Sequence, residues 1–175
     1  AYEPTLDYVV VKIPRWPFDK FPLADTTLGT QMKSTGEAMG IGRTFAAALL
    51  KAVRGLDLKH ETLTGGAYEQ WSEAELDAII VRPTHERLFA VCEKLRRSPQ
   101  CLEAIHTSST IDRWWLYELA TLVALEEALR SGDDSRTDEA YEAGDSRRAV
   151  ETLLGHESES VPAASFRMVD TAAAE

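Results

Sequence analysis

The spacing of apolar residues along this chain predicts a protein made mainly of helices. The clearest helix is expected from Arg113 to about Leu129, where apolar side chains surround the helix almost completely until Glu126. Asp112 can cap its first turn. A helix that is apolar nearly all round is either buried centrally or meets a partner. A second helix is expected from Phe45 to Leu56.

Capping signals mark shorter helices. Ser72 and Glu75 form a capping box, which predicts a helix from that point to about Val81. Pro83 suits the first turn of the next helix. That helix closes with three cations, which are favourable at a helix C-terminus: Lys94, Arg96 and Arg97.

The remaining segments are predicted with weaker signals. Ser98 and Pro99 cap a short helix through Ile105, and another short helix is expected at Thr137 to Ala143. Asp145 is a candidate N-cap for a helix from Ser146 to Leu154, and Gly155 suits the position after its end. Residues 57–71 and 156–165 lack periodicity and are interpreted as loop and connector.

One strand is predicted near the N-terminus. Tyr8 to Ile13 is apolar and β-branched except for Lys12, which is typical of a strand covered on both faces. No second convincing strand precedes residue 166, so the strand's partners are expected to come from elsewhere. The predicted fold is therefore mainly α: an irregular helical bundle with one N-terminal extended strand. The start at Ala1 without Met agrees with a segment cut from a longer protein.

Composition and spacing argue against several kinds of site. The net charge of −10 disfavours nucleic acid and anionic membrane surfaces as partners, and no apolar run approaches the length of a membrane span. Cys92 and Cys101 have no Cys-x-x-Cys spacing, which favours reduced core residues of a cytoplasmic protein. The four histidines are widely spaced, and no phosphate-binding glycine loop occurs. We therefore expect no catalytic, cofactor-binding or metal-binding residues within this segment.

Four motifs, in order, resemble one family. They read V-V-V-K-I-P-R-W at residues 9–16, Q-M-K-S-T-G-E-A-M-G-I-G-R-T at residues 31–44, I-D-R-W-W-L at residues 111–116 and F-R-M-V-D-T-A-A-A-E at residues 166–175. The chain resembles the carbamoyl phosphate synthase large subunit, in the region between its two synthetase halves. The resemblance implies that residues 1–44 are the C-terminal edge of the first ATP-grasp (carboxyphosphate) unit. Residues 45–165 would be the helical oligomerisation domain, and residues 166–175 the start of the second synthetase half.

The resemblance also implies an activity for the parent chain. That chain would be an ATP-dependent carbon–nitrogen ligase making carbamoyl phosphate from bicarbonate, glutamine-derived ammonia and ATP with Mg or Mn, for arginine and pyrimidine synthesis. Its partners would be the other domains of the large subunit, a glutaminase small subunit and further copies of itself. The nucleotide and metal sites would lie outside this segment, which alone should be inactive.

Glu37 leaves two interpretations open. From its setting between Gly36 and Ala38 it is either a first-turn helix carboxylate, which the residues favour, or a polar group that lines a cavity. The resemblance implies the second: Met32, Thr35 and Glu37 would form one wall of the passage that carries unstable intermediates to the second active site.

Trp114 and Trp115 are candidate interface residues. Adjacent helical positions point about 100° apart, so one tryptophan is expected to face the core and the other a second surface. Large aromatic side chains are typical hot spots of subunit contacts. An alternative function from a different class is a free-standing helical adaptor whose apolar helix binds a partner.

Overall fold

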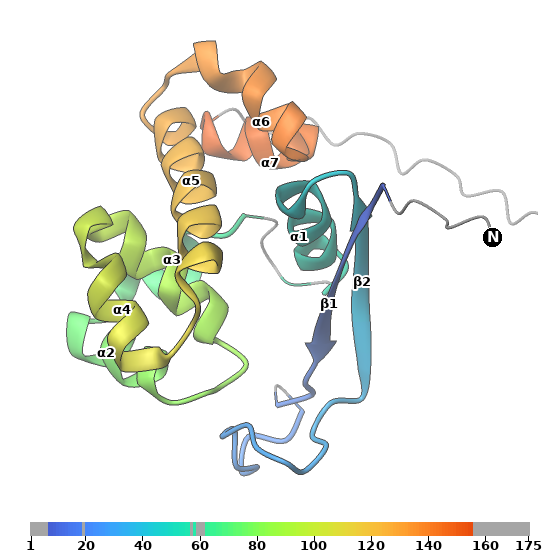
Figure 1. The fold of residues 1–175 in the computed structure, drawn as a ribbon, viewed down its shortest axis with the longest axis vertical. Coiled ribbons are helices and arrows are strands. Elements are labelled where there is room, and N and C mark those ends of the chain that lie inside the picture. Colours follow the sequence, from blue (N-terminus) through green and yellow to red (C-terminus); the bar gives the residue numbers. More distant parts are fainter. Residues whose placement is uncertain (1–6, 19, 57, 59–61, 156–175) are drawn as a thin grey trace, which may run out of the picture.

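The computed structural model describes residues 7–18, 20–56, 58 and 62–155. Within these residues the fold is mainly helical, with a two-stranded sheet on one side, which confirms the predicted fold class (Figure 1). The strands are β1 (Val9–Arg15) and β2 (Gly36–Gly42), and the short 3-10 helices are η1 (Gly66–Gln70), η2 (Pro99–Cys101) and η3 (Asp134–Arg136). The α-helices are α1 (Phe45–Arg54), α2 (Glu73–Val81), α3 (Arg87–Arg97), α4 (Leu102–Ser109), α5 (Arg113–Arg130), α6 (Thr137–Ala143) and α7 (Arg147–Leu153).

The strand β1 has a partner within the chain, so the expectation of no second strand before residue 166 is wrong. β1 and β2 are antiparallel, and Val9 is opposite Gly42 while Arg15 is opposite Gly36. The sequence pattern does not indicate β2, because this strand contains three glycines and glycine is uncommon in strands. Gly40 is needed at its position, because a Cβ atom there would lie 1.9 Å from the backbone oxygen of Ala48 on α1.

Only one face of the hairpin is covered, which corrects the expectation of a strand buried on both sides. Burial alternates along both strands, as it does in a sheet that packs one face on a core. The inner face meets α1 with Ala38 and Gly40 buried. The opposite side, which we name the outer face, consists of exposed residues: Val10, Lys12, Glu37, Met39 and Ile41.

The helix α5 is central, as predicted. Its N-terminal half joins the main core through Leu116, Leu119, Leu122 and Val123, which cluster with residues of α1, α2, α3 and α4. Its C-terminal half forms a second cluster with α6 and α7, built from Leu125, Leu129, Ala140, Val150 and Leu153. Figure 1 shows α6 and α7 at one end of α5, beside α1. α5 thus connects both parts of the core.

Most predicted helix starts are confirmed. Ser72 and Glu75 form a reciprocal capping box, and the Asp112 side chain accepts a hydrogen bond from the backbone N–H of Trp114 at 2.8 Å. At α7, however, the cap is Ser146, which accepts from the N–H of Ala149 at 3.1 Å, so the prediction of Asp145 as the N-cap is wrong. The carboxyl group of Asp145 is buried instead.

Two other expectations need correction. α3 begins at Arg87 rather than at Pro83, because the Pro83 carbonyl accepts a hydrogen bond from the N–H of Leu28 and the turn before Arg87 contacts the segment between the strands. The expected loop at residues 57–71 contains η1.

Both cysteines are free: Cys92 is buried and Cys101 is half-buried. The expected connector and the start of the second synthetase half lie outside the described residues.

Candidate functional site: two exposed faces on an acidic framework

The outer face of the hairpin carries Glu37. Its carboxylate oxygen lies 2.7 Å from the Nζ atom of Lys12 on the neighbouring strand, and both side chains are about half exposed. Glu37 therefore belongs to a strand, and the interpretation as a first-turn helix carboxylate is wrong. Around this ion pair, Val10, Met39 and Ile41 expose 42%, 57% and 46% of their surfaces. The result is an apolar sheet face with one ion pair across it.

The long segment between the strands is fastened to the helices. Besides the contact of Leu28 with Pro83, Arg82 at the end of α2 donates hydrogen bonds to Thr27 and to Asp25. Lys33 donates to the backbone oxygens of Asp25 and Thr27 and forms an ion pair with Asp25. The backbone N–H of Thr27, followed by Lys33, holds the pKa of Asp25 below its usual range. These contacts fix the segment that carries the expected passage residues.

Met32 and Thr35 lie on this segment and at its end. Met32 exposes 85% of its surface, and Thr35 is also exposed, with its backbone N–H donated to the carbonyl of Arg15 at 3.0 Å. The structure thus places Met32, Thr35 and Glu37 within one short exposed stretch of chain. Their role as a passage wall stays a prediction, because a wall needs a second side.

Trp114 and Trp115 form an aromatic group with Phe45, the first residue of α1. The two indole rings are edge-to-face at 4.6 Å, and Phe45 lies 5.2 Å from Trp114 and 4.9 Å from Trp115. Trp114 is 49% exposed and Trp115 is 45% exposed, so neither indole is buried in the core. The expectation that one tryptophan faces the core is therefore wrong. We name this group the aromatic face.

An apolar cavity of about 320 Å³ adjoins the aromatic face. Trp115 and Phe45 line one part of it, and residues of β1, α1, α3 and α5 line the rest, among them Val11, Leu49, Val91 and Leu119. The Arg87 guanidinium at its rim donates to the backbone oxygens of Ile80 and Ser109. Burial lowers the pKa of Arg87, but the group keeps its charge because its reference value is so high.

Glu126 is a buried acid on the central helix α5. One carboxylate oxygen accepts the backbone N–H of Leu63 at 2.7 Å, and the other accepts the N–H and the hydroxyl of Thr64 at 2.9 and 2.5 Å. Burial raises the pKa of Glu126, and the hydrogen bonds from Thr64 oppose that rise. Glu126 therefore ties the segment after α1 to the central helix.

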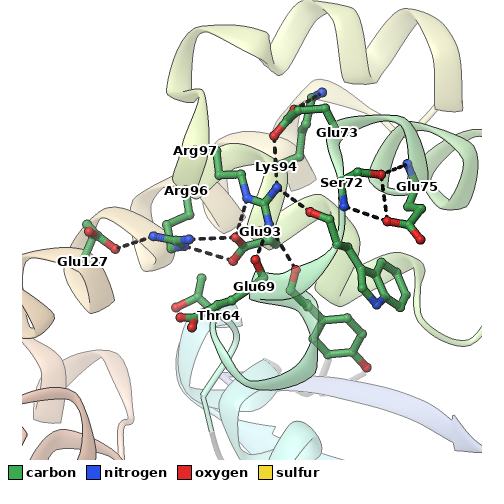
Figure 2. A network of polar contacts seen from close by, with 12 residues as sticks. Thr64, Glu69, Ser72, Glu73, Glu75, Glu93, Lys94, Arg96, Arg97 and Glu127 are labelled. Atoms are coloured by element: carbon green, nitrogen blue, oxygen red, sulfur yellow. Dashed lines mark hydrogen bonds and ion pairs between the residues drawn. The ribbon is translucent and has the colours of Figure 1, made fainter.

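A second buried acid, Glu93 on α3, organises the other side. It accepts hydrogen bonds from Arg96 at 2.7 Å and from Arg97 at 2.6 Å (Figure 2). Arg97 in turn donates to the backbone oxygens of Tyr68, Glu69 and Trp71 in and after η1. Burial alone would raise the pKa of Glu93, but the two arginines more than offset it and the pKa is lowered. The cations that the sequence assigns to the helix dipole thus hold η1 in place.

Neither Glu126 nor Glu93 belongs to a cluster of metal-binding side chains among the described residues. Among the residues that the structure describes, no group of three or more His, Cys, Asp or Glu side chains is arranged to hold a metal ion. In the same residues, no helix is both long and apolar enough to cross a membrane. The outer face and the aromatic face are the candidate contact surfaces.

Residues 37–168 match the family described as carbamoyl-phosphate synthetase large chain, oligomerisation domain. The chain belongs to the carbamoyl-phosphate synthetase large-chain family. The match starts in β2 and includes every described helix, so this helical body is the oligomerisation domain.

Curated relatives agree with this assignment. The chain is 40% identical over 184 residues to the carbamoyl phosphate synthase large chain of Methanothrix thermoacetophila, covering 100% of this chain and 17% of the relative. It is 42% identical over 188 residues to the arginine-specific large chain of Halalkalibacterium halodurans, covering 100% and 18%. It is also 40% identical over 202 residues to the N-terminal section of the large chain of Methanopyrus kandleri, covering 100% and 36%. The chain thus spans about a sixth of the first two relatives and little more than a third of the third.

For this carbamoyl-phosphate synthetase domain the sequence points to Glu37 and to the two tryptophans, but it reveals neither the strand β2 that builds the outer face nor the buried acids. The sequence does not predict the burial of Glu93, Glu126 and Asp145. A signal was present for Glu126, because an acid that follows a long apolar run on a central helix must find donors or solvent. For Glu93 and Asp145 no local signal exists, because their burial depends on elements distant in the sequence.

Proposed function

We propose that this chain is the non-catalytic oligomerisation and spacer domain of a carbamoyl phosphate synthase large chain, linking its two ATP-grasp halves. The parent enzyme would make carbamoyl phosphate from bicarbonate, glutamine-derived ammonia and ATP, with Mg or Mn bound in domains outside this chain. The relatives named above contain a similar segment within longer chains, which favours a spacer over a free-standing adaptor.

The observation that carries the proposal is the outer face. A two-stranded sheet with one apolar face exposed is marginal by itself and is usually completed by further strands or a packed layer. Val10, Met39 and Ile41 supply that unpartnered apolar surface. In the proposed arrangement the preceding part of the large chain covers it, and the hairpin is the point where the first ATP-grasp unit is joined to the helices.

The same arrangement gives Met32, Thr35 and Glu37 a role. All three are exposed at or beside the outer face, and the loop between the strands is held by Arg82 and Lys33. A wall of a passage needs this combination of fixed backbone and accessible side chains. We propose that they form one side of the passage, with the opposite side supplied by the rest of the large chain.

Substituting Ile41 with aspartate tests the covered outer face. In this chain alone the side chain is 46% exposed, so the free energy of unfolding should fall by only about 1 kcal/mol, the difference in strand propensity between the two residues. In a full-length large chain a buried charge should cost at least about 2 kcal/mol. Thermal unfolding of both proteins, with Tyr141→Asp at a comparably exposed position on α6 as the control, measures the difference. Equal small effects in both proteins would show that nothing covers the face.

The aromatic face is the candidate contact between copies of the large chain. Exposed Trp114, Trp115 and the adjoining apolar cavity form a patch of the kind that marks interfaces. A glutaminase small subunit would bind the parent enzyme at another surface, which this chain does not identify.

Self-association through the aromatic face should be lost in the Trp114→Ala and Trp115→Ala variants. Because burial of apolar area would drive it, the association should persist at high salt. Sedimentation equilibrium at low and high ionic strength measures it, with Tyr141→Ala as a control for loss of an exposed aromatic ring elsewhere. A dimer that neither tryptophan substitution weakens would move the interface to another surface, and a strict monomer at high micromolar concentration would refute self-association.

A further inference from the structure

Asp145 is a buried acid, and one of its two carboxyl oxygens is left without a donor among the described residues. It lies in the turn between α6 and α7, where the residue is only 8% exposed. Among the described residues its Oδ1 atom has no hydrogen-bond partner. Buried carboxyl oxygens are normally satisfied, as those of Glu93 and Glu126 are here. An unsatisfied carboxylate in such a place is unfavourable when charged and much less so when protonated.

The turn that carries Asp145 is held tightly against α1. Gly144 has a φ angle of 104°, and a Cβ atom there would lie 2.7 Å from the Cα atom of Ala47 on α1. The Arg54 guanidinium, also on α1, donates to the carbonyl oxygen of Gly144 at 3.0 Å. Because the backbone of the turn is fixed against α1, a backbone movement that exposes Oδ1 of Asp145 must separate the turn from α1.

The charges around Asp145 do not neutralise it. On α1 the facing cation is Arg54, whose Nη1 atom donates to the Gly144 carbonyl. On α5 the facing group is Glu126, an acid. Elsewhere on the two packed helices the charged groups are exposed or paired with one another: Asp138 and Glu142, Arg136 with Glu139, Arg147 with Glu151, and Arg148.

We propose that Asp145 is a proton-sensitive contact that controls the packing of α6 and α7. With its carboxyl neutral, the two helices pack against α1 and α5. With its carboxyl ionised, the balance shifts toward a state in which the α6–α7 pair has separated from α1 and the carboxylate is hydrated. This inference rests on the described contacts and does not depend on the proposed enzyme.

The direction of the pH dependence follows from proton linkage. Burial, followed by the charge of Glu126, raises the pKa of Asp145 in the packed state to about 7, from an ordinary value of 3.8. Between these two values the packed state binds a proton that the separated state releases. The separated state should therefore gain about tenfold in relative population for each unit of pH, and should gain nothing further above pH 7.

Hydrogen–deuterium exchange of this chain between pH 4.5 and 8.5 tests the proposal, with rates expressed as protection factors so that the intrinsic pH dependence of exchange is removed. Wild-type amides in residues 137–153 should lose about tenfold in protection per pH unit up to pH 7 and then level off. Asp145→Asn should abolish that slope, and Asp138→Asn, which changes an exposed acid on α6, should keep it.

Three results would overturn the proposal. The first is a wild-type protection factor in residues 137–153 that stays constant from pH 4.5 to 7. The second is an unchanged slope in Asp145→Asn. The third is an equal slope in α2 and α3, because that would indicate global unfolding rather than separation of α6 and α7. The wild-type measurement alone decides the first and third, so the test does not depend on the stability of the variant.

Discussion

The Glu126→Ala variant is expected to lose about 4 kcal/mol in its free energy of unfolding, a large fraction of the stability of a domain this size. The substitution removes the acceptor of two backbone N–H groups, those of Leu63 and Thr64, and of the Thr64 hydroxyl. Leu63 is 0% exposed and Thr64 is 2% exposed, so solvent does not replace the lost carboxylate. Each buried donor left without a partner costs about 1–3 kcal/mol.

Chemical denaturation monitored by tryptophan fluorescence measures this loss. The matched control is Glu127→Ala on the same helix, where the side chain is 46% exposed and its ion pairs with Arg96 and Arg130 are long, at 3.7 and 3.9 Å. That substitution should cost no more than about 1 kcal/mol. If the two variants unfold at the same denaturant concentration, Glu126 does not fasten the segment after α1.

Replacing Gly40 with alanine should destabilise the chain by more than about 3 kcal/mol, because the added methyl group has no space. Its carbon would lie 1.9 Å from the backbone oxygen of Ala48 and 2.7 Å from the backbone nitrogen of Ala52. Both atoms belong to the backbone of α1, so no side-chain rotation can relieve the contact. The hairpin would have to move away from the helix and lose the inner-face packing.

Gly36→Ala is the control for this experiment, since it lies in the same strand with nothing within 4 Å of the added carbon. Its effect should be within about 0.5 kcal/mol. Thermal unfolding of both variants separates a steric clash from a general effect of glycine replacement on the unfolded chain. Similar shifts in the two variants would mean that β2 and α1 are not in the contact described.

The helices were predictable because their signals are local. The capping box of Ser72 with Glu75 and the cap at Asp112 each involve neighbouring residues, and both are confirmed. The strand β2 was not predictable in this way. Its glycines allow the close approach of α1, which cannot be read from the sequence. Because glycine is uncommon in strands, the same residues argue against a strand at this position. Ser146 and Asp145 are adjacent and chemically similar as caps, and only the burial of Asp145 decides between them.

In the candidate site, too, local features were predictable and contacts between distant segments were not. Trp114 and Trp115 were identified as interface candidates from residue type and position, but the place of Phe45 against both rings depends on how α1 meets α5. Glu126, with partners 62 and 63 residues away in the sequence, could be suspected only from its setting in an apolar helix. Hydrogen bonds between residues so far apart in the sequence form only when the elements pack together, and no local sequence pattern predicts them.

The bare-backbone contact between β2 and α1 also has a mechanical consequence. Where side chains separate two elements, changes of rotamer absorb small displacements, as between sliding helices. Between Gly40 and Ala48 no such compressible layer exists. A push on the strand is therefore carried directly to α1, and from Leu50 and Val53 of α1 into the core shared with Leu116 of α5. We therefore expect the sheet and the first helix to move together as one rigid unit, so that a displacement of the hairpin reaches the centre of the helical body.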